Sequence, residues 1–145
     1  MRKNHYLAMK TAHQKEWDAF PMFFAFNEQQ FAEGMKKLGL APHQTEMLCA
    51  LGRTGGYIRK SDREKLQEMM DRQCREKEEA IASDLSGEGF IREMFSYELS
   101  NHEYCYTEDL TDTLSALGLS EEQINNNDAL RHGLALAISE QISEE

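Results

Sequence analysis

No apolar run in this chain approaches the roughly 20 residues that a membrane-spanning helix requires. The first residues, 1–14, are basic, but no continuous apolar segment follows them, so we expect no secretory signal. Cysteine is scarce as well: the 3 cysteines are an odd number and form no Cys-x-x-Cys motif. This pattern argues against a disulfide framework and predicts reduced thiols in a cytoplasmic protein.

Basic residues are nearly absent from the last third of the chain. After Arg92 the sequence contains a single lysine or arginine, Arg131. Residues 1–92 carry 15 basic and 14 acidic side chains, whereas residues 93–145 carry 1 and 12, so this last segment accounts for essentially all of the net charge of -10. An acidic surface of this kind repels nucleic acid and attracts cations or basic proteins. The alternative is that the charge serves only solubility.

The composition that remains is that of a folded protein. Of the 145 residues, 40% are hydrophobic and 29% are charged, which suits a globular fold rather than a disordered chain. Glycines, prolines and capping signals divide the sequence into segments with apolar stripes of helical period. We predict a mainly α fold, a single domain over residues 1–145, with about six helices and a small two-stranded β element.

Local signals place individual elements. Ser120 and Gln123 have the spacing of a capping box and therefore predict the start of a helix. Segment 40–51 predicts another short helix, which begins after its proline. The aromatic run Phe23–Phe26 and the residues Tyr57–Arg59, which follow a glycine-rich turn, are the two predicted strands, paired with each other.

The stretch Phe90–Thr107 predicts one helix that concentrates reactive side chains on one side. Two apolar residues lead into Glu98, His102 and Cys105 with spacings of three and four residues. On a continuous helix these spacings bring a carboxylate, an imidazole and a thiol to the same face.

One interpretation of this face is a zinc site. Glu98, His102 and Cys105 supply three ligands of types that zinc prefers, and either His132 on the final helix or Glu103 would complete a tetrahedral shell. The substitutes for the fourth ligand are the two histidines of the first helical segment, His5 and His13. A structural zinc would contribute to the free energy of folding.

Two other interpretations of the same residues stay open. In the first, His102 only hydrogen-bonds Glu98 at the edge of the core, and Cys105 packs as a small apolar side chain. In the second, the chain is an enzyme in which His102 is the general base, Glu98 orients it and Cys105 is a nucleophile. Because all three come from one helix and no second catalytic segment is visible, we expect a protein that is not an enzyme.

Three segments carry a resemblance to a known family: FFAFNEQQFAEGMKKLGL, GGYIRKSD and FSYELSNHEYC. Together they resemble a family of small uncharacterised proteins encoded on phages and mobile elements of gut bacteria, over about residues 20–119. The resemblance implies an accessory protein in the bacterial cytoplasm and carries no catalytic residue over. Small acidic proteins of such elements often inhibit host defence, and anti-CRISPR proteins are one example.

The functional expectation combines this resemblance with the charge pattern. We expect a non-enzymatic binding protein that occupies a basic, nucleic-acid-binding surface of a host protein, such as a Cas nuclease. It would not bind nucleic acid directly or attach to a membrane. The expected partner-binding residues are acidic side chains of the last third: Glu108, Asp109, Asp112, Glu121 and Glu122.

Overall fold

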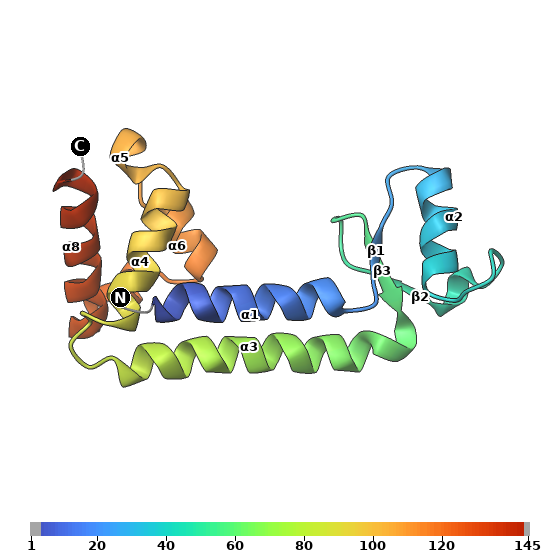
Figure 1. The fold of residues 1–145 in the computed structure, drawn as a ribbon, viewed down its shortest axis with the longest axis horizontal. Coiled ribbons are helices and arrows are strands. Elements are labelled where there is room, and N and C mark those ends of the chain that lie inside the picture. The colour runs from blue at the N-terminus through green and yellow to red at the C-terminus, as the bar shows by residue number, and fades with distance from the viewer. Residues whose placement is uncertain (1–3, 144–145) are drawn as a thin grey trace. The chain divides into compact units, whose positions relative to one another are not determined.

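The computed structural model describes residues 4–143, apart from the side chains of Cys105, Tyr106 and Ser143. Helices dominate, and a small antiparallel sheet accompanies them (Figure 1), which confirms the mainly α fold. The elements in chain order are α1 (His5–Ala19), β1 (Phe23–Phe24), α2 (Glu28–Lys37), β2 (Leu48–Ala50), β3 (Gly56–Arg59), α3 (Arg63–Ser83), α4 (Phe90–Asn101), α5 (Tyr104–Thr107), α6 (Thr111–Leu117), α7 (Glu121–Asn125) and α8 (Asp128–Ser143). No helix within the described residues is long and apolar enough to cross a membrane.

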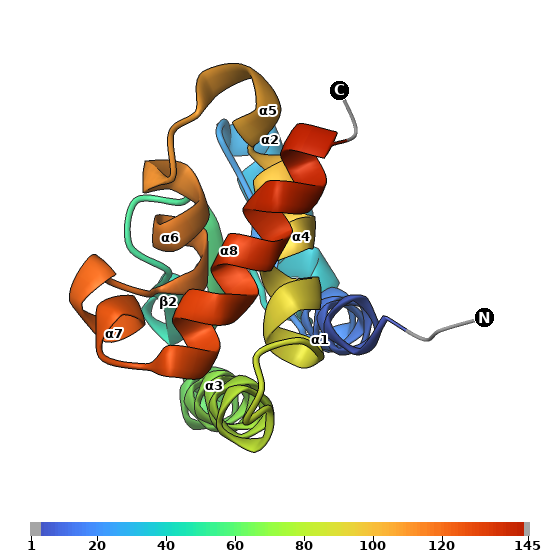
Figure 2. The same cartoon turned by 90° about the vertical axis from the view of Figure 1, so that its left-hand side faces the viewer.

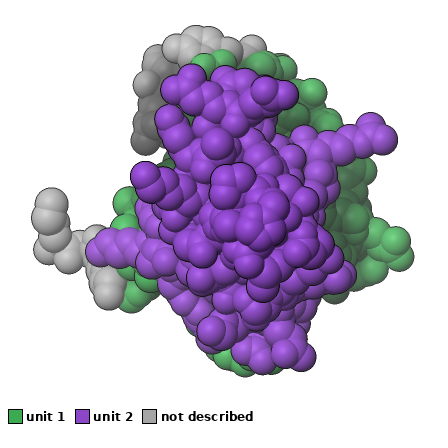
Figure 3. All heavy atoms as spheres, turned by 90° about the vertical axis from the view of Figure 1, so that its right-hand side faces the viewer, with its two compact units in different colours: residues 1–14, 75–145 green, residues 15–74 purple. Residues whose placement is uncertain are grey.

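The chain forms two compact units, which Figure 3 distinguishes by colour. Unit 1 consists of residues 1–14 and 75–145, and unit 2 of residues 15–74. The boundaries fall inside α1 and α3, so each of these helices contributes residues to both units. Unit 2 is therefore an insertion between the two segments that build unit 1.

Unit 2 is organised around the sheet, in which β3 lies between β1 and β2. The predicted pairing of the two strands is confirmed, since Phe23 lies opposite Tyr57 and their rings stack with centroids 5.3 Å apart. Helix α2 covers β1 at Gly34, where the Phe23 ring occupies the space that a Cβ atom would need. Ile58 of β3 is fully buried.

The short helix predicted over residues 40–51 is wrong. A single 3₁₀ turn forms at Thr45–Met47, and the chain then enters β2, which pairs with β3 from Leu48 opposite Arg59 to Ala50 opposite Tyr57. Within the described residues the sheet has three strands rather than the two expected. An apolar run as short as residues 47–51 fits a strand or a helix equally well, and the hydrogen bonds that β3 offers decide the outcome.

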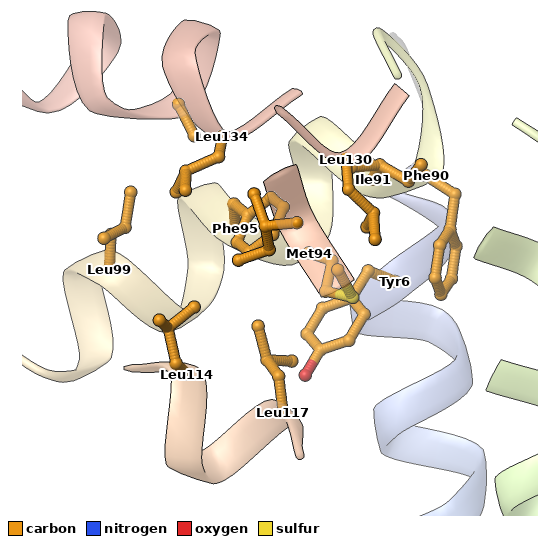
Figure 4. Close-up of a cluster of buried hydrophobic side chains, with 12 residues drawn as sticks. Tyr6, Phe90, Ile91, Met94, Phe95, Leu99, Leu114, Leu117, Leu130 and Leu134 are labelled. Atoms are coloured by element: carbon orange, nitrogen blue, oxygen red, sulfur yellow. The ribbon is translucent and has the colours of Figure 1, made fainter. Parts of the chain in front are cut away.

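Unit 1 is built on the contact between α4 and α8 (Figure 2). Helix α4 points its apolar face toward Leu130 and Leu134 of α8, and Leu114 and Leu117 of α6 close the cluster (Figure 4). Helix α4 supplies most of the fully buried members of this core, which are Ile91, Met94, Phe95 and Leu99 of α4 and Ala137 of α8.

A carboxylate from the preceding loop fixes the start of α4. The two Asp84 side-chain oxygens accept hydrogen bonds from the backbone N–H groups of Gly87 at 3.2 Å, Gly89 at 3.1 Å and Ile91 at 2.9 Å. Negative charge at this position also interacts favourably with the partial positive charge of the helix N-terminus. One side chain therefore shapes the whole connection between α3 and α4.

The single helix predicted over Phe90–Thr107 is also wrong, because the helix breaks at His102 and Glu103. Helix α4 ends at Asn101, His102 is its C-cap, and Glu103 adopts a left-handed conformation with φ of 54° before α5 begins. A left-handed residue costs about 1 kcal/mol for a residue with a Cβ atom, so its neighbours must hold it there. No glycine or proline marks this break in the sequence.

Gly133 on α8 is required by the close approach of α8 to the start of α4. A Cβ atom at this position would lie 2.5 Å from Ile91 Cγ2 and 2.6 Å from the Gly87 carbonyl oxygen. On an exposed helix surface Gly→Ala stabilises by about 1 kcal/mol. Here we expect Gly133→Ala to lower the free energy of unfolding by about 1–3 kcal/mol, since the clash exceeds the gain in helix propensity.

Urea denaturation of Gly133→Ala measures this effect. The control is Ser139→Ala, an exposed position of the same helix, which should change the free energy of unfolding by less than about 0.5 kcal/mol. A Gly133→Ala variant more stable than the wild type would contradict the close approach.

Candidate functional site

The Glu98 carboxylate is the centre of the candidate site. Glu98 lies on the inward face of α4 and is only 1% exposed, among the apolar side chains of the unit 1 core. A buried carboxylate without partners would cost several kcal/mol, so its surroundings must supply donors. The hydrogen-bond donors come from helix α1, and His102 at the end of α4 adds a close contact.

The two donors on helix α1 are Tyr6 and Lys10. The Tyr6 hydroxyl donates to Glu98 Oε1 at 2.6 Å, and Lys10 Nζ donates to the same oxygen at 3.1 Å. Tyr6 and Lys10 are four residues apart, which places them one above the other on the same face of α1. The Lys10 ammonium also lies 5.4 Å from the centre of the Tyr97 ring. The carboxylate therefore has an ammonium counter-ion and a phenol donor.

His102 approaches the second oxygen of the carboxylate. His102 Nε2 lies 3.4 Å from Glu98 Oε2, a close approach that their four-residue spacing allows. The contact qualifies as an ion pair by distance but lacks the alignment of a hydrogen bond, and Nε2 is buried with no hydrogen-bond partner in the described part of the chain. The His102 side chain as a whole is 26% exposed. Within the cluster, His102 Nε2 is therefore the polar atom whose hydrogen-bonding capacity is unused.

The surroundings of Tyr6 keep its hydroxyl protonated. Burial raises the pKa of Tyr6 well above its ordinary value, and the hydrogen bond to the Glu98 carboxylate raises this pKa further. A tyrosinate next to a buried carboxylate would place two negative charges in contact. Tyr6 therefore acts as a fixed hydrogen-bond donor and not as a proton source.

The remaining predicted metal ligands do not join this cluster. The side chain of Cys105 lies outside the described residues, and its backbone belongs to α5, beyond the left-handed Glu103. His132 Nε2 lies 3.4 Å from Glu88 Oε1 in the loop before α4. His102 is at the other end of α4, about 16 Å further along at 1.5 Å per residue. The structure brings Glu98 and His102 together, but not His132.

The two substitute histidines, His5 and His13, do not join the Glu98 cluster either. The His5 backbone N–H donates to Glu93 Oε1, and His13 Nε2 lies 3.1 Å from Glu76 Oε2. Among the side chains that the structure describes, no group of three or more histidines, cysteines or carboxylates is arranged to hold a metal ion.

Tyr6 and Lys10 belong to the site but were not predicted as members of it. Tyr6 fits the apolar stripe of the first helix, and nothing local marks it as the partner of a residue 92 positions away. The four-residue spacing of Tyr6 and Lys10 places them together but does not identify their acceptor.

The five predicted partner-binding residues are all exposed and lie in the segment from α5 to α7. Glu108 follows α5, Asp112 is in the first turn of α6, and Glu121 and Glu122 are in the first turn of α7. Asp109 accepts a hydrogen bond from the Thr111 backbone at 2.9 Å, and the side-chain and backbone bonds from Thr111 lower the pKa of Asp109. No described lysine, arginine or histidine pairs with any of the five.

The hydrogen bond from Tyr6 to Glu98 generates a stability prediction. We expect Tyr6→Phe to lower the free energy of unfolding by about 2 kcal/mol near neutral pH, because it removes a donor from a buried charged acceptor. The wild type should also lose stability above about pH 10. Since the folded-state pKa of Tyr6 lies above the unfolded-state value, the unfolded state releases its proton first, and each pH unit costs about 1.4 kcal/mol for that group.

Denaturant titrations from about pH 7 to pH 11 test both effects. The control is Tyr97→Phe, because the Tyr97 hydroxyl has no hydrogen-bond partner among the described residues, whereas its ring makes similar contacts. Tyr97→Phe should keep the alkaline decline, and Tyr6→Phe should reduce it. An alkaline decline that is the same in both variants would show that Tyr6 does not hold its proton in the folded state.

Comparison with known proteins identifies a family but no activity. No curated protein and no solved structure matches the chain. A family of unknown function, DUF7659, matches over residues 5–140, which extends beyond the segments that carried the resemblance in the sequence. The match covers nearly the whole chain, including α1, the Glu98 cluster and the acidic segment. The chain therefore belongs to the DUF7659 family.

Proposed function

We propose that this chain is a non-enzymatic binding protein that engages a basic surface of a partner protein through the exposed carboxylates of α5–α7. The observation that carries the proposal is the division of charge between the units. Unit 2 contains 9 basic and 9 acidic residues, whereas unit 1 contains 7 and 17, which together give the 16 and 26 of the chain. The whole net charge of -10 therefore belongs to unit 1.

The unpaired state of the acidic side chains supports this proposal. Glu108, Asp109, Asp112, Glu121 and Glu122 keep their full charge toward solvent, because no described basic side chain neutralises them. Charges of one sign on one surface steer an oppositely charged partner and fix its orientation. They also oppose contact with nucleic acid, so the partner is a protein with a basic patch.

The segment that carries these charges is well supported by the core of unit 1. In Figure 2, α6 and α7 lie on the same side of α8. Leu114, Leu117 and Ile124 are buried beneath the acidic residues, and the Ser120 capping box fixes the start of α7. A partner would therefore meet carboxylates that are already in position, which lowers the entropic cost of binding.

We further propose that the partner is a host-defence protein. The basic surface would be the nucleic-acid-binding surface of a host-defence protein, such as a Cas nuclease, and the chain would come from a phage or mobile element in a bacterial host. This specific form of the proposal rests on the resemblance of the sequence segments and on analogy with other small acidic inhibitors. It predicts competition between this protein and nucleic acid for one surface.

Charge reversal tests the binding surface. We expect the double variant Glu121→Lys and Glu122→Lys to weaken association with a purified Cas nuclease by at least about tenfold, because two favourable charges become unfavourable. Raising the salt from about 0.1 M to about 1 M should weaken the wild-type complex as well, since the Debye length falls from about 10 Å to about 3 Å. Surface plasmon resonance measures both.

The matched control is a double variant of unit 2 with the same change in charge. Glu28→Lys with Glu33→Lys alters two exposed acidic residues of α2 and should leave the association unchanged. Equal effects of the two double variants would mean that net charge alone, and not the α5–α7 surface, governs binding. Failure of the wild type to bind any purified Cas nuclease at low salt would overturn the specific form of the proposal.

The second candidate is a zinc-stabilised regulatory protein or a small metal- or thiol-dependent enzyme centred on His102. The observation that favours it is the buried Nε2 of His102, which has no hydrogen-bond partner in the described part of the chain and lies beside Glu98. Both side chains are of types that bind zinc. Another segment would have to complete the ligand shell, because His132 lies elsewhere in unit 1.

Elemental analysis of protein purified without a histidine tag tests this candidate. Bound zinc at one equivalent, together with a melting temperature that falls on chelation and in His102→Ala, would support it. Zinc far below one equivalent and a melt indifferent to chelator would leave Glu98 and His102 as part of a metal-free ionic cluster. For the enzyme form, loss of a turnover activity in His102→Ala is the corresponding measurement.

A further inference from the structure

Unit 2 contains a cavity of about 380 Å³ that no part of the proposed function uses. The end of α1, the residue Arg59 at the end of β3 and the first turns of α3 surround it, and all of its lining residues belong to unit 2. Phe20, Pro21 and Met69 form much of the apolar wall. The volume falls within the range of small-molecule sites, roughly 300–1,000 Å³.

We propose that this cavity binds a small monocarboxylate that carries an apolar group. The carboxylate would lie against Arg59 and Lys65, and the apolar group against Phe20 and Met69. Four features of the cavity support this assignment: a positioned guanidinium, carboxylates that already have partners, an unpaired ammonium and an apolar wall.

Arg59 is held in place by two hydrogen bonds and keeps unused N–H donors. Its Nε donates to Asp62 Oδ2 at 2.8 Å, and its Nη1 donates to the Leu38 carbonyl oxygen at 3.4 Å. Asp62 is only 5% exposed, whereas the Arg59 side chain is 36% exposed. A guanidinium has five N–H donors, and Nη2 of Arg59 has no partner among the described residues. The free edge of a fixed guanidinium suits a carboxylate.

The uncompensated charge on the lining is positive. The two carboxylates at the cavity are both engaged by guanidinium groups, Asp62 by Arg59 and Glu16 by Arg72. Lys65, in the first turn of α3, has no carboxylate within ion-pair distance among the described residues. The N-terminus of this long helix adds further positive potential. An anion is therefore favoured over a cation.

The same lining favours a single negative charge over a phosphate. Asp62 and Glu16 both border the cavity, so a doubly charged ligand would meet two carboxylates at close range. The apolar residues along the wall would gain from burial of a hydrocarbon group, at about 25 cal/mol per Å². An amphipathic monocarboxylate satisfies both conditions.

The chain contains its own reporter for this site. Trp17 is the single tryptophan, and its Nε1 donates to Gln73 Oε1 at 3.1 Å. It packs in the same apolar cluster as Phe20 and Met69, which line the cavity. A ligand that contacts those two side chains should change the fluorescence of Trp17.

Octanoate is the probe for the test, followed by Trp17 fluorescence and by calorimetry. Octanamide supplies the same apolar chain without the charge, and acetate supplies the charge without the chain. We expect octanoate to bind at least about tenfold more tightly than either, because it alone makes both the charge-assisted and the apolar contacts. Equal affinity for octanamide, or no saturable response to octanoate, overturns the proposal.

Variants locate the bound carboxylate. Lys65→Gln should weaken octanoate binding about threefold and Lys65→Glu should weaken it further, whereas Lys36→Gln, an exposed lysine of α2 outside the cavity, should leave the affinity unchanged. Arg59→Gln combined with Asp62→Asn removes the guanidinium without leaving a buried charge unpaired, and should abolish binding. Wild-type affinity in Lys65→Glu overturns the proposal even if the Arg59 double variant does not fold.

Discussion

A single buried carboxylate connects the first helix to the core of unit 1. Glu98 is surrounded by apolar side chains, so its charge is tolerable only because Tyr6 and Lys10 reach it from α1. Loss of either donor would leave part of the charge uncompensated in a low-dielectric environment. The same residue anchors α4, whose other inward side chains pack on α8. The contact of Glu98 with Tyr6 and Lys10 therefore ties α1 to the core of unit 1 and keeps a polar group within that core.

The two units divide the physical tasks of the chain. Unit 1 has a large apolar cluster, a buried ionic group and the entire charge excess, which suits long-range attraction of a basic partner. Unit 2 is electrically neutral, holds the sheet and contains the Arg59 cavity, which suits short-range recognition of a small molecule. The binding proposal and the ligand proposal rest on different units, so each stands without the other.

Local signals explain most of what the sequence could predict. The capping box at Ser120, the pairing of Phe23 with Tyr57 and the four-residue spacing of Glu98 and His102 all depend on near neighbours or on strong strand signals, and all appear in the structure. Strand β2 was missed because β3 supplies its hydrogen bonds, and the break at Glu103 was missed because no glycine marks it. Tyr6 and Lys10 could not be assigned to Glu98, since only the folded chain brings them together.

The insertion of unit 2 has a consequence for biosynthesis. Unit 2 is one continuous segment, so all of its residues are present once residue 74 has left the ribosome. Unit 1 is incomplete at that point, because Tyr6 must wait for a partner that lies 92 residues later in the chain. During that interval the apolar face of the first segment has no core to join, and closing so long a loop slows folding. The nascent chain therefore cannot complete the core of unit 1 until α4 has been made.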